Sequence, residues 1–427
     1  MVRDDHHLVT AIAASIEGSQ VLKYHVRPHY DEEGILTSLS ISKCGLREWP
    51  PELWELTGLQ GLDLSENLLT RLPPEIRQLS NLRGLNLANN QISAIPSEIG
   101  SLHQLEHLTL YDNFLNALPP EIGRLHRLKT FGLSRNHLTT LPREIGSLQN
   151  LETLFLSFNR LEALPSTIGQ LQQLRHLNLS ENQLHDLPSE IGRLKNVEKL
   201  SLEANQLAEL PPEIGQLQAL HVLDLMRNQL RWLPVELGSL SQLQKLLLSG
   251  NALRQLPAEI GQLHHLVILS LGMNELEYVF PEIAQLENLE ELYIPYNGLH
   301  EFPLQITRLS HLRHLDLAHN EMSKLPHELG RLSSLETLDL EDNLLREIPS
   351  EVGQLTQLQL LNLANNKLRA LPPEIGQLRN LQECDLSNNR IRALPGAITD
   401  MPNFEIVTLT NNPLKEASNI RAVNDLN

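Results

Sequence analysis

The chain has 427 residues, of which 34 are Lys or Arg and 52 are Asp or Glu, so its formal net charge at pH 7 is −18. A chain this acidic is a poor partner for DNA, RNA or anionic membranes, because proteins that bind polyanions need clustered Lys and Arg. No run of residues approaches the ~18 consecutive apolar residues of a membrane-spanning helix. We therefore expect neither nucleic acid nor membrane among the partners of this chain.

The first 35 residues differ from the rest and predict an N-terminal cap. Residues 5–17 are expected to form a short helix that Gly18 ends. Residues 21–26 and 35–41 are expected to form two strands, joined by a turn through residues 31–34. Such a cap would shield one end of the core from water.

The N-terminus and the cysteines bear on the compartment. The short apolar run near the start follows one Arg3 and two aspartates, whereas a secretory signal begins with positive charge. Cys44 and Cys384 lie 384 − 44 = 340 positions apart and are not expected to pair, so nothing asks for an oxidising compartment. We expect the protein to be cytoplasmic.

From residue 36 to residue 414 the sequence repeats with a fixed period of 23 residues. An Asn recurs sixteen times without insertion or deletion, and Cys44 takes its place in one earlier unit, which gives seventeen units. The recurring asparagines are Asn67, Asn90, Asn113, Asn136, Asn159, Asn182, Asn205, Asn228, Asn251, Asn274, Asn297, Asn320, Asn343, Asn366, Asn389 and Asn412.

Each unit follows the pattern LxxLxLxxNxLxxLPxEIGxLxx, and each part of the pattern has a physical meaning. The LxL step has the period of a short strand whose leucines face a core. The Asn ends the strand, where its side chain can bond neighbouring backbone groups and form a ladder from unit to unit. Pro follows six residues later, except at Phe280, and the EIGxL segment predicts one 3₁₀-like turn.

One such coil cannot bury its own leucines, whereas stacked coils share a continuous core. The expected fold is an α/β solenoid: a curved horseshoe with a parallel β-sheet on its concave face and short turns or 3₁₀ segments on its convex face. Seventeen strands at a spacing of roughly 4.8 Å would make an inner surface on the order of 80 Å long. Residues 415–427 are expected to form a short C-terminal tail, with no room for an effector domain.

Over residues 36–414 these units resemble the leucine-rich repeat family. The LPxEIGxL form is most similar to the repeats of intracellular bacterial and plant proteins and of Ras-scaffold and cell-polarity proteins. The resemblance implies protein binding rather than catalysis. It does not imply a particular partner, because variable positions set the partner within the family.

Motifs that carry chemistry are absent from the sequence. It contains no GxxxxGK[ST], GxGxxG, HExxH, GxSxG or CxxC. The nearest approach to a metal site is His314, Asp316 and His319 with Asp339 in the next unit, but no fourth ligand or tight spacing accompanies them. Solvated polar residues are the better interpretation, so we expect no enzyme, no cofactor and no metal.

Function is instead expected on the concave strand face, at the residues 6, 4, 2 and 1 before each Asn and at the one after it. These 5 positions make 5 × 17 = 85 of 427 residues, so two to three of the 13 Phe and Tyr would fall there by chance. Six do. Exposed aromatic residues beside Arg are typical of the hot spots of protein interfaces.

Two candidate patches result from this distribution. The first either binds a partner or covers strand backbone by stacking of its rings, and comprises Tyr111, Phe114, Arg135, His137, Phe155, Phe158 and Arg160. The second lies near Pro295, where Phe280 and Ala284 also depart from the pattern, and is either a binding surface or a tolerated defect; it comprises Met226, Met273, Tyr293 and Tyr296.

Carboxylates crowd the same face toward the C-terminus. Like charges on neighbouring strands repel, so the cluster carries a cost. It is interpreted either as a dock for a basic segment of a partner or as a solvated face that prevents self-association. The cluster comprises Asp316, Asp339, Glu341, Asp342, Glu383 and Asp385.

The sequence thus predicts a monomeric, non-catalytic protein-binding scaffold or adaptor that acts through its concave face in intracellular signalling. Its partner would be a protein with a basic segment or a small GTPase. One alternative is an exported or surface-associated structural repeat protein. Another is a sensor subunit for a separate GTPase or kinase effector.

Overall fold

The computed structural model describes residues 5–16, 26–400 and 406–414. The chain divides into two compact units. Unit 1 comprises Met1–Leu207 and Gln216–Leu220, and unit 2 comprises Ala208–Gly215 and His221–Asn427. Both are built from 23-residue coils, each with one short strand and one 3₁₀ turn.

Unit 1 begins with a helix and an antiparallel hairpin, after which the strands of successive coils pair in parallel. Its helix and strands are α1 (His6–Ser15), β1 (Val26–Tyr30), β2 (Leu36–Ile41), β3 (Gly61–Asp63), β4 (Gly84–Asn86), β5 (His107–Thr109), β6 (Thr130–Gly132), β7 (Thr153–Phe155), β8 (His176–Asn178) and β9 (Lys199–Ser201). Its 3₁₀ turns are η2 (Pro51–Glu55), η3 (Pro74–Gln78), η4 (Ser97–Ser101), η5 (Pro120–Arg124), η6 (Arg143–Ser147), η7 (Ser166–Gln170) and η8 (Ser189–Arg193), while η9 (Pro212–Gln216) is divided between the units.

Unit 2 consists of the same kind of coil, again with parallel strands. Its strands are β10 (Val222–Asp224), β11 (Lys245–Leu247), β12 (Ile268–Ser270), β13 (Glu291–Tyr293), β14 (His314–Asp316), β15 (Thr337–Asp339), β16 (Leu360–Asn362), β17 (Glu383–Asp385) and β18 (Ile406–Thr408). Its 3₁₀ turns are η10 (Val235–Ser239), η11 (Ala258–Gln262), η12 (Pro281–Gln285), η13 (Leu304–Arg308), η14 (His327–Arg331), η15 (Ser350–Gln354), η16 (Pro373–Gln377) and η17 (Gly396–Asp400).

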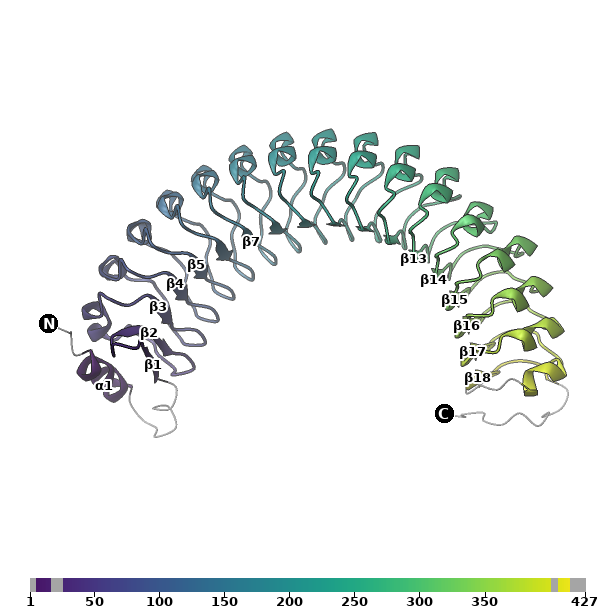
Figure 1. The fold of residues 1–427 in the computed structure, drawn as a ribbon, viewed down its shortest axis with the longest axis horizontal. Helices are drawn as coiled ribbons and strands as arrows, with labels where there is room; N and C mark the ends of the chain where they lie inside the picture. The colour runs from purple at the N-terminus through teal and green to yellow at the C-terminus, as the bar shows by residue number, and fades with distance from the viewer. Residues whose placement is uncertain (1–4, 17–25, 401–405, 415–427) are drawn as a thin grey trace. The chain divides into compact units, whose positions relative to one another are not determined.

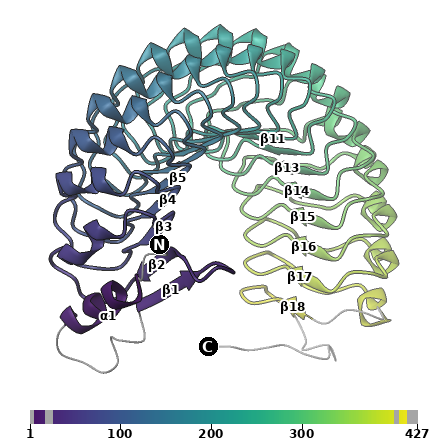
Figure 2. The ribbon, with the colours of Figure 1, turned by 60° about the vertical axis from the view of Figure 1, so that its left-hand side comes forward.

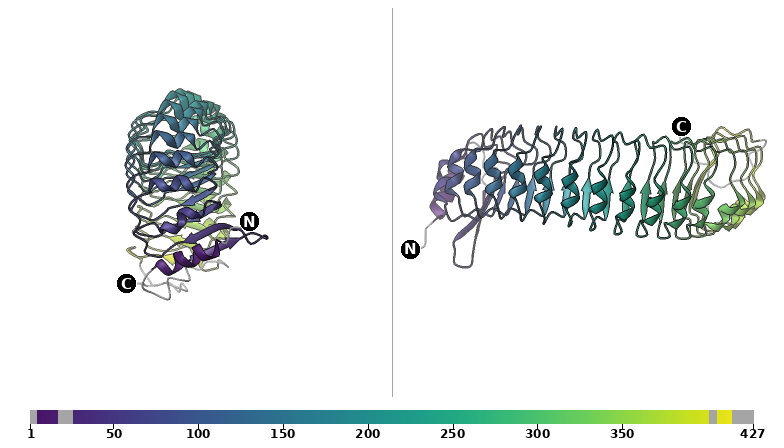
Figure 3. Two further views of the ribbon diagram at one scale, coloured as in Figure 1. Left: turned by 90° about the vertical axis from the view of Figure 1, so that its left-hand side faces the viewer. Right: turned by 90° about the horizontal axis from the view of Figure 1, so that it is seen from above.

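The register of both sheets follows the 23-residue period. Leu62 pairs with Leu85 in unit 1, and Leu315 pairs with Leu338 in unit 2, so equivalent residues form columns across the strands. Within each unit the strands line the inner side of an arc and the 3₁₀ turns its outer side (Figures 1 and 2). The turns keep to that side along each unit when seen from two further directions (Figure 3). The predicted parallel sheet and 3₁₀ turns are confirmed.

The N-terminal elements differ in part from the prediction. Helix α1 ends at Ser15 rather than at residue 17, and Gly18 lies outside the described residues. Of the predicted strand 21–26 only Val26 is described, and β1 continues from it through Pro28 to Tyr30. Among the described residues β1 pairs with β2 alone, and such an edge strand tolerates a proline because no further strand needs its missing N–H group.

The predicted turn between β1 and β2 is confirmed. The carboxylate of Asp31 accepts hydrogen bonds from the N–H groups of Glu33 (3.0 Å) and Ile35 (2.8 Å). Gly34 has a φ of 77°, in the left-handed region that glycine adopts without a steric penalty. On the other side of the cap, α1 packs against η2 and buries Ile12 completely.

A buried asparagine links each coil to its neighbour, as the ladder prediction requires. The Nδ2 group of Asn159 donates to the carbonyl of Leu133 in the preceding coil at 3.0 Å and to that of Leu156 in its own coil at 3.0 Å. Its Oδ1 accepts the N–H of Leu138 in the preceding coil at 3.0 Å. The amide therefore satisfies backbone groups at strand ends that water cannot reach.

Cys44 takes the asparagine position where the partner strand before it is the antiparallel β1. Oδ1 of Asn67 accepts the N–H of Leu46 at 3.0 Å, as in the other coils, and it also accepts the N–H of Cys44 at 3.0 Å. The thiol of Cys44 lies 3.3 Å from the carbonyl of Ser42. The first coil is thus bonded by Asn67 of the next coil. It needs no asparagine of its own, because no parallel coil precedes it. This explains why the pattern tolerates a cysteine there.

On the outer side, glycine allows the 3₁₀ turns to stack closely. A Cβ atom on Gly123 would lie 2.7 Å from the carbonyl oxygen of Glu144 in the next coil, closer than real Cβ atoms approach. Trp54, Arg77, Ala284 and Thr307 occupy this position in η2, η3, η12 and η13, so these turns carry a side chain where turns such as η5 have a glycine. Of these departures, sequence analysis singled out Ala284 alone.

The ladder predicts a large cost for removing one amide. Asn159→Ala would leave backbone groups of Leu133 and Leu138 buried without partners, and each such group costs about 1–3 kcal/mol. We expect the free energy of unfolding to fall by about 2–4 kcal/mol in urea denaturation, with faster amide exchange at residues 133–161.

Asn150→Ala is the matched control, at the end of the adjacent coil. Asn150 is exposed and donates one hydrogen bond, to the carbonyl of His126 in the preceding coil at 2.7 Å. We expect a loss below about 1 kcal/mol for this variant. Equal losses in both variants would contradict the special role of the buried amide.

Candidate functional site

The residue before each asparagine has a left-handed backbone conformation, which determines the direction of its side chain. Arg135, Phe158, Met273 and Tyr296 all have φ between 53° and 55°, and Gly250 takes the position in one coil. A left-handed backbone costs an ordinary L-residue roughly 1–2 kcal/mol, and Asn, Asp and Gly bear it best. The aromatic side chains of Phe158 and Tyr296 are therefore not demanded by the turn.

Part of the first predicted patch forms a cation–π cluster in unit 1. The guanidinium carbon of Arg135 lies 4.8 Å from the ring centre of Phe158 and 6.0 Å from that of Tyr111. Beside it, the ring of Phe114 stacks on that of His137, with 5.7 Å between centroids and 27° between planes. Phe114 and Phe158 are nevertheless 48% and 46% exposed, so these contacts leave nearly half of their area available.

Phe155 stands apart from these stacks on the strand face itself. It is the last residue of β7, is 40% exposed, and has no ring contact with another aromatic residue in the described part of the chain. In register with it on β6 is Gly132, and a Cβ built there would meet nothing closer than the Thr109 methyl group, at 3.6 Å. Gly132 is itself buried, and a Cβ there would be in ordinary van der Waals contact with Thr109, so the glycine leaves Phe155 without a side chain beside it on β6. Sequence analysis missed Gly132, although a glycine four residues before the asparagine was a visible signal.

Arg160, the remaining residue of this patch, is exposed and takes part in neither stack. The patch thus presents three exposed phenylalanines and two arginines over three consecutive coils. This composition matches the aromatic and Arg enrichment of protein interfaces.

The second predicted patch lies in unit 2 and is only partly contiguous. Tyr296 stacks on His319 at 3.9 Å between centroids and 13° between planes, and Nδ1 of His319 lies 2.8 Å from a carboxylate oxygen of Asp342. Met273 is 60% exposed in the coil before Tyr296. Met226 belongs to a coil two before that of Met273, roughly 10 Å away along the sheet, so it does not extend the patch directly.

Tyr293, at the end of β13, has a strongly perturbed hydroxyl. Burial raises its pKa to about 12, with a further contribution from its hydrogen bond of 2.8 Å to Glu291. The hydroxyl is therefore neutral at pH 7 and holds the neighbouring carboxylate. Pro295 follows two residues later, and its carbonyl accepts the bond from Asn297 at 3.1 Å, so the ladder continues through the irregular coil.

The predicted acidic cluster is contiguous over part of its length. Asp316 and Asp339 are in register on β14 and β15, and burial raises the pKa of each, with a smaller contribution from the negative charge of Glu341. Asn362 donates to both Asp339 (3.2 Å) and Glu341 (3.1 Å) and disperses some of their charge.

The rest of the acidic cluster is interrupted. Asp342 is engaged with His319. Asn362 stands on β16 between Asp339 and Asp385, so Asp385 is not adjacent to the other aspartates on the sheet. Glu383, on β17, is exposed.

The histidines considered as metal ligands have other partners. His314 Nδ1 lies 2.9 Å from the hydroxyl of Thr337, and His319 contacts Asp342. Across the described ranges, no three or more His, Cys, Asp or Glu side chains are grouped so that they could hold a metal ion. Nor does any helix in these ranges have the length and apolarity to cross a membrane.

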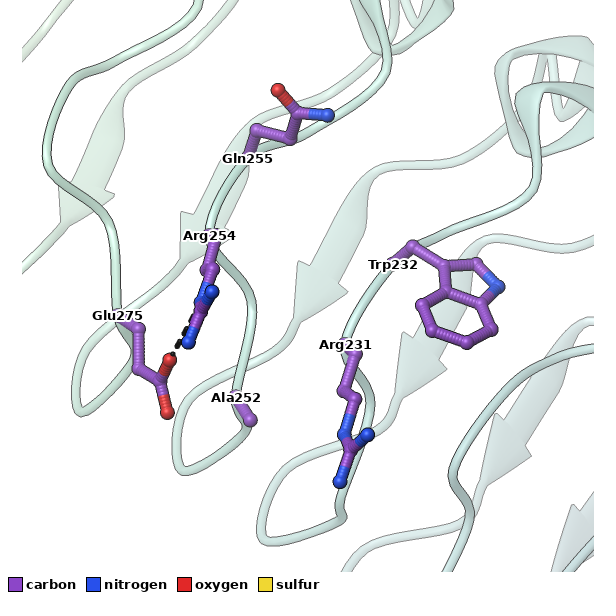
Figure 4. Close-up of a pocket in the computed structure, with 6 residues that line it drawn as sticks. All are labelled: Arg231, Trp232, Ala252, Arg254, Gln255 and Glu275. Atoms are coloured by element: carbon purple, nitrogen blue, oxygen red, sulfur yellow. Dashed lines mark hydrogen bonds and ion pairs between the residues drawn. The ribbon is translucent and has the colours of Figure 1, made fainter.

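A second exposed surface, beside the strand face, was missed by sequence analysis. In unit 2 a hollow of about 770 Å³ is lined by Arg231, Trp232, Ala252, Arg254, Gln255 and Glu275. Figure 4 shows Arg254 paired with Glu275 on one side, and Trp232 on the neighbouring coil with its ring turned away from that pair. Trp232 is 53% exposed. It was missed because only positions on the concave face were considered.

Family models cover the repeats from end to end. A leucine-rich repeat region model matches residues 115–205, 168–229, 200–299 and 300–368, and a leucine rich repeat model matches residues 35–92, 58–115 and 356–414. The chain belongs to the leucine-rich repeat family. Its fold is accordingly a leucine-rich repeat solenoid, as the resemblance implied.

Solved structures agree with this assignment. This leucine-rich repeat chain is 38% identical to a leucine-rich repeat protein of Leptospira interrogans, with a TM-score of 0.75 and coverage of 91% of this chain and 95% of that one. It is 26% identical to the Arabidopsis receptor kinase HAESA, solved with the peptide hormone IDA and the co-receptor SERK1, with a TM-score of 0.76 and coverage of 96% and 74%. It is 27% identical to a TDR receptor, with a TM-score of 0.68 and coverage of 88% and 76%. No curated protein matches the chain significantly.

The raised pKa values make a prediction about stability. A carboxyl group whose pKa is raised by folding lowers the stability of the protein as the pH rises from below about 4 through the raised pKa. The double variant Asp316→Asn/Asp339→Asn should therefore melt at a higher temperature at pH 7, by on the order of 1–2 °C. The gain should shrink as the pH falls below about 4, where the wild-type carboxyls are protonated in both states.

The variant should fold because asparagine already serves at this position. Asn86 and Asn178 accept the backbone N–H two residues on, at 3.1 and 3.0 Å, as Asp316 does from Ala318 at 2.9 Å. Asp63→Asn is the control, since its register partners are Ser40 and Asn86 rather than carboxylates. A melting temperature that fell at pH 7, or a gain independent of pH, would contradict the cost assigned to these two charges.

Proposed function

We propose that this protein is a non-catalytic scaffold that binds a protein partner through the strand face of its unit 1. The observation that carries the proposal is Phe155, exposed on the strand face beside Gly132, a residue without a side chain. Burying Phe155 and its neighbours against a partner would remove a large apolar area from water at little rotamer cost. Arg135, already ordered against Phe158, would add charge-assisted hydrogen bonds at the rim.

The comparisons support the general class of this function. The leucine-rich repeat fold commonly mediates protein–protein interaction, and the chain matches its family models throughout the repeats. The HAESA structure contains a bound peptide hormone and a co-receptor, so a solenoid similar to this one at 26% identity presents surfaces for protein ligands. The identity of the partner of this chain is set by the variable columns.

We further propose a cytoplasmic, monomeric scaffold in intracellular signalling. Cys44 and Cys384 are both buried and unpaired, and burial raises the pKa of each thiol, to about 12 for Cys384, so both are poorly reactive. That neither cysteine forms a disulfide favours a reducing compartment over the alternative of an exported structural protein. It leaves open the alternative of a sensor subunit for a separate GTPase or kinase effector.

The acidic cluster of unit 2 supports a partner that carries a basic segment. Asp316, Asp339 and Glu341 remain together at a cost in stability, and a cationic segment would relieve their mutual repulsion. A small GTPase with such a segment is one partner of this chemistry.

Two variants test the aromatic surface in different ways. Phe155→Ala/Phe158→Ala removes exposed rings. Gly132→Asn places an amide side chain beside Phe155, the same side chain that Asn178 supplies at the equivalent position two strands on. We expect both variants to lose a protein retained by the wild type in affinity capture from native lysate, by about 10-fold or more in measured affinity once that protein is purified. Neither should lower the melting temperature by more than a few degrees.

The control for these variants is Trp232→Ala/Tyr278→Ala. It also removes two exposed aromatic residues, 53% and 54% exposed, but at positions away from the strand face. We expect it to bind as the wild type does. If all variants captured the same proteins with the same affinity, the strand face of unit 1 would not be the binding surface.

A further inference from the structure

Unit 2 contains a recurring contact between neighbouring coils that joins opposite charges at two places. It runs from the third residue after one asparagine to the first residue after the next. Arg254 Nε lies 3.0 Å from a carboxylate oxygen of Glu275 in this contact, and His300 Nδ1 lies 3.2 Å from that of Glu321. The geometry of the coils thus brings the two side chains within ion-pair distance.

In the last coils the same contact joins like charges. The pair Arg254 and Glu275 is replaced by Arg346 and Lys367, and then by Arg369 and Arg390, while Arg392 occupies the third position of the following coil. We call these five residues, Arg346, Lys367, Arg369, Arg390 and Arg392, the basic edge. Like charges in such a contact destabilise by roughly what an exposed ion pair contributes, up to about 1 kcal/mol each.

Nothing within the described residues neutralises the basic edge. None of its five side chains forms an ion pair or hydrogen bond there, although Glu347 follows Arg346 directly in the chain. The four arginines are exposed and Lys367 is half-buried. Arg369, Arg390 and Arg392, with Pro413, line a hollow of about 530 Å³. In a chain of net charge −18, five neighbouring cations without counter-ions stand out.

We propose that the basic edge binds an extended acidic segment of a partner protein, one rich in Asp and Glu side chains. A guanidinium group donates two parallel hydrogen bonds to one carboxylate, and several guanidinium groups together recognise acidic motifs. Three coils spaced roughly 4.8 Å apart span about 10 Å, and alternate side chains of an extended segment lie roughly 7 Å apart, so two successive carboxylates on one face of the segment fit within the edge. Binding would remove the repulsion that the empty edge carries. This surface is distinct from the aromatic strand face of unit 1.

A peptide fits the basic edge better than nucleic acid does. The strand face of the same coils carries Asp339, Glu341 and Asp385, which would repel a long polyanion that extends beyond the edge. A short acidic segment can confine its charge to the edge. The five cations are also spread along a row rather than gathered around one point, which suits a run of carboxylates better than a single phosphate.

The test measures binding of fluorescein-labelled hexaglutamate to the full chain by fluorescence anisotropy at low salt. Saturable binding that weakens with added NaCl is expected for the wild type. Arg369→Gln/Arg390→Gln/Arg392→Gln should bind at least about 10-fold more weakly. The control Arg124→Gln/Arg193→Gln/Arg331→Gln removes the same charge at the ends of η5, η8 and η14 and should bind as the wild type does.

One substitution separates loss of binding from loss of folding. Arg390→Glu places a carboxylate opposite Arg369, as Glu275 lies opposite Arg254, so the melting temperature should be unchanged or higher while hexaglutamate binding falls. Phe155→Ala/Phe158→Ala should bind hexaglutamate normally, which separates this proposal from the function proposed for unit 1.

Four results would overturn the proposal: no saturable hexaglutamate binding by the wild type, equal loss in the charge-matched control, a phosphoserine peptide without other acids that binds in place of hexaglutamate, or a DNA duplex that does so through the same arginines.

Discussion

From coil to coil, an asparagine side chain bonds backbone groups of its own strand end and of the coil before it, in a place that water does not reach. Because the amide bonds to the backbone, the rest of the coil is freed from making specific side-chain contacts across the strand face. Leucines fill the core, glycine lets the outer turns stack, and proline starts each turn. All of these residues maintain the fold, and none of them is available to recognise a partner.

The remaining columns carry whatever the chain does, and there the protein retains arrangements that cost stability. Phe158 and Tyr296 have left-handed backbones, Asp316 and Asp339 have pKa values raised by burial, and the basic edge brings cations together where other coils form ion pairs. A frame with so many equivalent coils can tolerate these local costs. Under the functions proposed above, a partner would offset these costs by supplying an apolar surface or an opposite charge.

The period of 23 residues was enough to predict the strands, their parallel register, the 3₁₀ turns and the asparagine ladder, because each depends on residues that recur in every coil. The cap was predicted less well. β1 runs through Pro28 because an edge strand tolerates a missing N–H group, and the local sequence does not indicate that this strand lies at an edge. For the candidate site, composition by column selected Phe155, Phe158 and Arg135, and their role in binding stays a prediction. It missed Gly132 because an absent side chain is not counted, and the basic edge because that contact joins positions outside the strand face.

The most direct test of the account is site-specific photo-crosslinking in native lysate, with p-benzoylphenylalanine in place of Phe155 on the strand face or in place of Tyr278 off it. Both side chains are exposed, so both probes can reach a partner if one is present. The account predicts a discrete adduct with one protein from position 155, abolished by Gly132→Asn, and none from position 278. Equal adducts from both positions, or an adduct from position 278 alone, would contradict it.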